Sequence, residues 1–191
     1  MKLKVATVAS LLALTSTSAL AHTATVAEHS SLLSGLIHPL VGLDHLLAML
    51  AMGFWAAMQK GQLRIQIPMV FMLVLVAGFL LGQTAFSLPV VEGGIATSVL
   101  MLGLLIATAV RLPAVAAMGL SGIFALFHGY AHGAEAVASS MTLFAAVFLG
   151  SSLMLHLCGG IAANTVKTQL PTLAKLAGLL IAAAGATLLV A

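Results

Sequence analysis

The sequence predicts an all-α membrane protein with about six transmembrane helices that follow a cleavable N-terminal signal peptide. Of its 191 residues, 62% are hydrophobic and only 6% are charged, and the mean hydropathy is +1.21. A water-soluble domain typically carries about 25% charged residues. The apolar residues also gather in long segments, each about as long as a membrane helix needs to be. Only four residues are Asp or Glu, too few to cover a soluble surface, so the composition excludes a soluble enzyme.

The cysteine and basic residues exclude further classes. One cysteine, Cys158, cannot form an intramolecular disulfide or a Cys-rich metal cluster. Seven Lys and Arg residues are spread along the chain and make no basic patch for nucleic acid. We therefore expect a lipid bilayer, and no nucleic acid, as the surroundings of this chain.

Residues 1–21 have the pattern of a secretory signal peptide. Lys2 and Lys4 precede an apolar stretch over residues 5–14, and Ala19-Leu20-Ala21 matches an A-x-A cleavage site. This apolar stretch is too short to span a hydrocarbon core about 30 Å thick. We expect cleavage after residue 21, which leaves residues 22–191 as one transmembrane domain. The alternative is an uncleaved N-terminal anchor.

Hydropathy divides the mature chain into six spans, and the basic residues orient them. The spans run over residues 38–58, 67–86, 93–110, 113–132, 137–157 and 171–190. With residue 22 outside, the cytoplasmic side receives every Lys and Arg of the mature chain, namely Lys60, Arg64, Arg111, Lys167 and Lys175, as the positive-inside rule requires. We predict a multi-pass protein of the bacterial inner membrane with a periplasmic mature N-terminus.

Two motifs place ionisable side chains inside these spans, where such residues are costly and indicate function. The first, His38-Pro39-Leu40-Val41-Gly42-Leu43-Asp44-His45, lies at the outer end of the first span. The second, His128-Gly129-Tyr130-Ala131-His132-Gly133-Ala134-Glu135, lies at the outer end of the fourth. Both motifs lie at similar depth, so we expect their side chains to meet.

Helical spacing and charge favour a divalent metal ion at this place. His128 and His132 share a helix face at i, i+4, and Glu135 returns to that face at i+7. Asp44 and Glu135 have no Lys or Arg on their side of the membrane, and burying them unpaired would be costly. Imidazole and carboxylate ligands suit Ni²⁺, Co²⁺, Zn²⁺ or Cu²⁺ better than Mg²⁺ or Ca²⁺. The sequence therefore predicts a site for a divalent metal ion among the clustered histidines and carboxylates on the outer side.

Other side chains are secondary candidates for the same ion. They are His22 and His29 in the outer segment, Met49 and Met52 in the first span, and His156 in the fifth. The alternative for the methionines is ordinary core packing. The alternative for His156 is a hydrogen bond between neighbouring helices. Glu92-Gly93-Gly94 is expected to form an outer loop.

The two motifs together resemble the signature of the HupE/UreJ family. His38 to His45 matches H-P-x-x-G-x-D-H, and Phe127 to Glu135 matches F-H-G-x-A-H-G-x-E. The predicted signal peptide and six spans also match, so the resemblance covers essentially the whole chain. It implies a bacterial inner-membrane permease domain over residues 22–191 that supplies nickel, or in some relatives cobalt, to hydrogenase or urease. It also implies the residues that handle the metal, which are His38, Asp44, His45, His128, His132 and Glu135.

The expected function is therefore uptake of Ni²⁺, or of Co²⁺, from the periplasm, with an indirect link to assembly of a nickel enzyme. The ion would be cargo, and no permanent cofactor is expected. The sequence has no G-x-x-x-x-G-K-[ST] segment for ATP, so we expect facilitated diffusion or secondary transport. One alternative is an intramembrane zinc-dependent hydrolase with Glu135 as general base. Another is a periplasm-facing metal sensor or assembly partner without flux.

Overall fold

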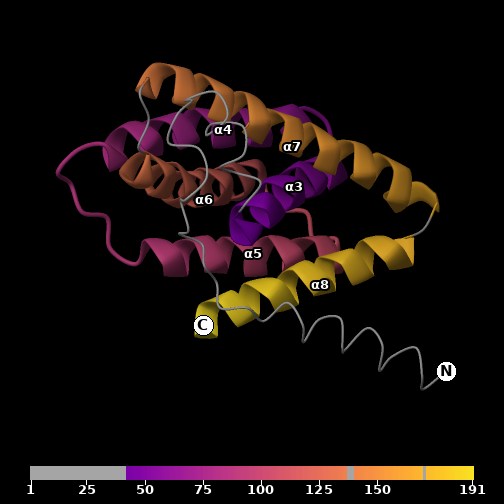
Figure 1. The fold of residues 1–191 in the computed structure, drawn as a ribbon. Helices are drawn as coiled ribbons and strands as arrows, with labels where there is room; N and C mark the ends of the chain where they lie inside the picture. The colour runs from indigo at the N-terminus through magenta and orange to yellow at the C-terminus, as the bar shows by residue number, and fades with distance from the viewer. Residues whose placement is uncertain (1–41, 137–139, 170) are drawn as a thin grey trace.

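The computed structural model describes residues 42–136, 140–169 and 171–191, and every element in this part of the chain is an α-helix (Figure 1). The helices are α3 (Leu43–Met58), α4 (Leu63–Gly82), α5 (Val91–Thr108), α6 (Ala114–Glu135), α7 (Met141–Gln169) and α8 (Pro171–Val190). The expected signal peptide lies outside the described residues, as do His22, His29 and His38.

The six helices correspond one to one with the six predicted spans. Five of them are long and apolar enough to cross a membrane, and α3 is a shorter apolar helix of 16 residues. Their outer faces carry large apolar side chains such as Leu73 and Ile161, which are 68% and 66% exposed. A soluble protein would bury most of this surface, whereas lipid tails solvate it. The all-α membrane fold is confirmed.

Several helix ends differ from the hydropathy prediction. Helix α4 begins at Leu63, four residues early, and it includes Arg64, whose Nε donates to the Gln59 carbonyl at 2.7 Å. Helix α7 continues to Gln169, well past the predicted end at Leu157. The expected outer loop at Glu92-Gly93-Gly94 is wrong, because these residues form the first turn of α5.

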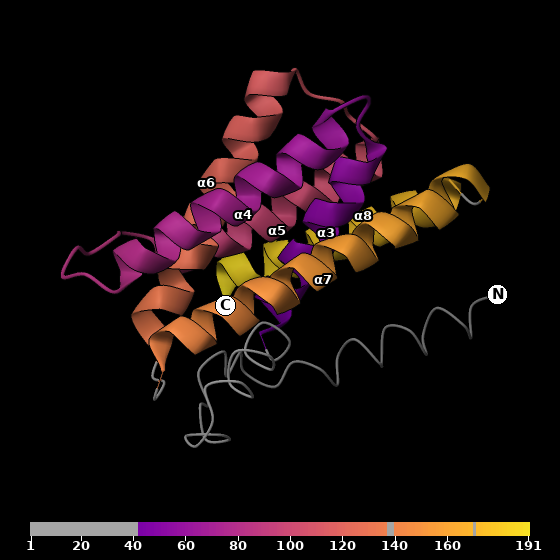
Figure 2. The ribbon, with the colours of Figure 1, turned by 90° about the horizontal axis from the view of Figure 1, so that it is seen from above.

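The helices associate as three closely packed pairs, α4 with α6, α5 with α8 and α3 with α7. Figure 1 shows α3 inside the bundle, between α7 and α5, and Figure 2 shows the bundle from above. Trp55, Met49 and Met52 of α3 are fully buried. Helix α3 therefore forms the centre of the core, with its first turn, Asp44 and His45 included, facing α6.

Glycines at matching depths allow the α4–α6 pair to pack closely. Gly78 and Gly82 of α4 face Gly129 and Gly133 of α6, and a Cβ on any of these glycines would meet the backbone of the opposite helix. Such small-residue interfaces are typical of membrane helices, which gain no hydrophobic driving force from lipid. The glycines of the second motif thus hold α6 against α4.

Candidate metal site

The structure brings together the histidines of the two motifs. The ring centroid of His45 on α3 lies 4.7 Å from that of His128 and 4.1 Å from that of His132, both on α6. His128 is completely buried, and His132 is 2% exposed. The predicted meeting of the first and second motifs is therefore seen in these three rings, which with Asp44 we call the outer cluster.

Asp44 orients the ring of His45. Its Oδ1 accepts hydrogen bonds from the backbone N–H of His45 at 2.8 Å and from His45 Nδ1 at 2.9 Å. A Cβ at Gly42 would come within 2.9 Å of the same oxygen, so the motif glycine makes room for this pair. Because a carboxylate only accepts, the ring proton sits on Nδ1. The buried Nε2 then carries a lone pair and has no hydrogen-bond partner among the described residues.

Ser98 of α5 orients the ring of His128 in the same way. Its Oγ lies 2.7 Å from the Ile95 carbonyl and 2.8 Å from His128 Nε2. The hydroxyl has one proton, which goes to the carbonyl, so Nε2 must donate to Oγ. Nδ1 of His128 therefore carries the lone pair, and it too is buried without a hydrogen-bond partner in the described part of the chain.

These two arrangements have the pattern of metal-binding histidines. A ligating histidine almost always donates its second ring N–H to a carboxylate, a carbonyl or another polar group, which fixes the tautomer and the ring orientation. Sequence patterns indicated Asp44 as a ligand but missed Ser98. The only signal for Ser98 was a polar residue on a buried face of an apolar helix, which is common in membrane proteins.

The three imidazole rings of the outer cluster are not arranged around a common point where one ion could sit. His45 is perpendicular to His128 and inclined by 63° to His132. In the described ranges, no group of three or more His, Cys, Asp or Glu side chains is set to hold a metal ion. Rotation of the side chains would be needed to direct the lone pairs at one ion, which suits a transient stop better than a storage site.

The predicted ligand Glu135 is not buried with these histidines. It is the last residue of α6, and its side chain is exposed, as is that of Glu92 in the first turn of α5. Both belong to the end of the bundle where α3 begins. The described basic residues Lys60, Arg64, Arg111 and Lys175 belong to the opposite end. This end of the bundle therefore presents negative charge, which raises the local concentration of cations.

Of the secondary candidates that the structure describes, His156 has the clearest polar environment. It is 3% exposed on α7, and its Nδ1 lies 2.7 Å from the Ser152 carbonyl. Met49 and Met52 are completely buried in the apolar core, consistent with core packing. Because Met49 follows His45 by four residues and Met52 by seven, both lie on the same face of α3 as His45.

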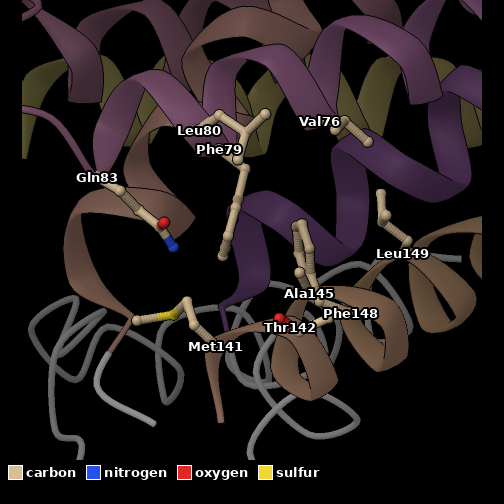
Figure 3. A pocket seen from close by; sticks show the side chains of 9 residues that line it. All are labelled: Val76, Phe79, Leu80, Gln83, Met141, Thr142, Ala145, Phe148 and Leu149. Carbon is tan, nitrogen blue, oxygen red and sulfur yellow. The ribbon is translucent and has the colours of Figure 1, made fainter.

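A pocket of about 240 Å³ opens between α4 and α7 (Figure 3). Its wall is mainly apolar, with Phe79 and Phe148 prominent and Gln83 and Thr142 as polar members. The ring of Phe148 also lies 4.3 Å from that of His132, centroid to centroid. An apolar lining cannot replace the water shell of a cation, so the histidines and not this pocket are the candidate binding site.

Replacement of Ser98 by alanine tests whether the orientation of His128 matters. We expect Ser98→Ala to weaken metal binding about 10- to 100-fold, because the ring loses the acceptor that fixes its tautomer. Equilibrium ⁶³Ni²⁺ binding to the purified protein measures this effect. Thr97→Ala, at an exposed neighbouring position, serves as the control. Equal affinities of Ser98→Ala and wild type would show that this hydrogen bond has no such role.

Comparison with known proteins identifies the family. The family model described as HupE / UreJ protein matches residues 10–188. The chain belongs to the HupE/UreJ family. A HupE relative, Protein HupE of Rhizobium leguminosarum bv. viciae, is 41% identical over 189 residues, which cover 98% of this chain and 97% of the relative. No solved structure matches the chain. The HupE/UreJ match spans both motifs and extends from before α3 to within two residues of the end of α8.

Proposed function

We propose that this HupE/UreJ protein is a permease that carries Ni²⁺, or the chemically similar Co²⁺, from the periplasm across the bacterial inner membrane. The observation that carries the proposal is the outer cluster. His45 and His128 each have one ring nitrogen held by a polar partner and one buried ring nitrogen with no hydrogen-bond partner among the described residues. Imidazole nitrogen together with carboxylate oxygen is a donor set for late divalent transition metals.

Charge supports the same proposal. Asp44 is 8% exposed, and its described partner is the imidazole and backbone of His45. A carboxylate in apolar surroundings needs positive charge nearby, and a divalent cation at the cluster would supply it. Glu92 and Glu135 at the same end of the bundle would attract the hydrated ion before it reaches the histidines.

The distribution of basic residues supports the orientation. If the basic end of the bundle faces the cytoplasm, the outer cluster faces the periplasm, and the mature N-terminus lies on that side. The delivered ion would supply a nickel enzyme such as hydrogenase or urease. Binding must then be strong enough for entry and weak enough for release, which agrees with rings that are close but not fixed around one point.

The comparisons give no support to the zinc hydrolase alternative. A hydrolase needs a stable ligand set with an open water position, and Glu135, its expected general base, is exposed at the helix end. The alternative of a metal sensor without flux makes a different prediction, because it would bind the ion without moving it.

Uptake of ⁶³Ni²⁺ by nickel-starved cells tests the proposal. Cells that express the protein should accumulate more ⁶³Ni²⁺ than cells with empty vector. Excess unlabelled Ni²⁺ or Co²⁺ should suppress this uptake, whereas excess Mg²⁺, which imidazole binds poorly, should not. Accumulation equal to that of the vector control, at verified membrane levels of the protein, would reject the permease function.

A further inference from the structure

A continuous row of aromatic and imidazole rings leads inward from the outer cluster. Beyond His128, the next ring is that of Phe71 on α4, whose centroid is 6.2 Å away. The ring of His156 on α7 follows, 4.9 Å from Phe71. Phe71 is completely buried and His156 is 3% exposed. Four helices, α3, α6, α4 and α7, therefore contribute to one row that ends at the buried imidazole of His156.

His156 lies deeper in the bundle than the outer cluster. Its backbone packs against Gly53 of α3, where a Cβ would overlap the His156 carbonyl. Gly53 follows His45 by eight residues, which corresponds to roughly 12 Å along a helix axis. The backbone of His156 therefore lies well inside the membrane-spanning part of the protein.

The ring of His156 is prepared for a ligand in the same way as the outer histidines. Nδ1 lies 2.7 Å from the Ser152 carbonyl, and a carbonyl only accepts, so Nδ1 carries the proton. Nε2 therefore carries a lone pair, and it is buried with no hydrogen-bond partner among the described residues. A purely structural imidazole would leave this nitrogen unsatisfied at a cost in stability. A carbonyl partner on the second nitrogen is typical of metal-ligating histidines.

We propose that His156 is a second binding position for the transported divalent metal ion, reached from the outer cluster past the ring of Phe71. This inference rests on the proposed function and adds an inner position to it. An ion at the outer cluster would exchange a ligand for Nε2 of His156 when the Phe71 ring turns aside. Two positions in series allow each to bind weakly enough for release while the path as a whole remains selective.

The variant His156→Gln separates this role from a structural one. Glutamine keeps an N–H group and a polar side chain but removes the imidazole lone pair. We expect ⁶³Ni²⁺ uptake into cells to fall at least about tenfold, as for loss of a group that tunes a metal site. Equilibrium ⁶³Ni²⁺ binding of the purified protein at the outer cluster should remain within about twofold, because the ligands there are untouched. Cys158→Ser, at an exposed position on the same helix, is the matched control and should change neither quantity.

Each outcome bears on the inference separately from the permease function. Wild-type uptake together with unchanged uptake by His156→Gln would overturn the inner position while leaving the permease intact. Absence of wild-type uptake would instead reject the permease function. If His156→Gln does not fold, crystals of the wild-type protein grown with Ni²⁺ decide. The proposal predicts an anomalous scattering peak at a metal–nitrogen distance of about 2.1 Å from Nε2, and the lack of a peak there would overturn it.

Discussion

Ni²⁺ uptake should fall at least about 100-fold when His45 is replaced by alanine. This loss is larger than the one expected for Ser98→Ala, because His45 is a proposed ligand, whereas Ser98 only orients one. His45 is the only ring that contacts both His128 and His132 among the described contacts. It also joins Asp44 to the cluster through the 2.9 Å contact with Nδ1. His45→Ala therefore removes a ligand and disconnects the carboxylate from the imidazoles of α6. Initial rates of ⁶³Ni²⁺ uptake at matched membrane levels measure the loss.

Leu43→Ala is the matched control for this prediction. Leu43 belongs to the same first turn of α3, but its side chain is 58% exposed and its loss leaves the cluster intact. We expect uptake by this variant to stay within about twofold of wild type, as for an exposed position with little effect on stability. If His45→Ala transported as well as Leu43→Ala, the outer cluster would not lie on the transport path.

The second large effect is expected at the α4–α6 interface. Gly133→Val should destabilise the folded protein by about 3 kcal/mol or more, because added core atoms force shifts of the packed structure. A Cβ at Gly133 would overlap the backbone carbonyl of Phe79, and a carbonyl held in a helix cannot turn aside as a side chain can. The temperature at which the detergent-solubilised protein loses its monodisperse elution peak measures this effect.

Gly119→Val provides the control on the same helix. Gly119 is exposed on α6, and a Cβ there would meet no atom within 4 Å. The melting temperature of the Gly119→Val protein should therefore remain close to that of wild type. Because both variants introduce valine, the helix propensity of the new residue is the same in both. Equal melting of Gly133→Val and Gly119→Val would contradict the close glycine packing of α4 against α6.

Much of the fold follows from composition and hydropathy, since the length of an apolar segment is set by the bilayer. The last predicted span, residues 171–190, agrees with α8 at both ends. The ends of other helices are governed by local contacts that hydropathy does not record. The fifth span was predicted to end at Leu157, yet α7 continues through Gly159, which packs against the Leu50 carbonyl of α3.

The candidate site was predictable only in part, for a similar reason. Sequence spacing places His128 and His132 on one face and matches their depth to His45, and the ring contacts agree. The same spacing places Glu135 on that face, but this residue ends the helix and is exposed. Ser98 and Phe71 come to the histidines from other helices. Their roles depend on how four helices pack, which no local pattern encodes.

Flux through the purified protein tests the central proposal most directly. Full-length protein in sealed liposomes should admit ⁶³Ni²⁺ faster than protein-free liposomes, and His45→Ala protein should not exceed the protein-free rate. This comparison also separates a permease from a sensor, because binding alone saturates at the amount of protein present, whereas transport fills the lumen. Accumulation well beyond two ions per protein, the number of proposed binding positions, is the predicted result, and His45→Ala should abolish it. Wild-type accumulation that stops at the bound amount would contradict the account.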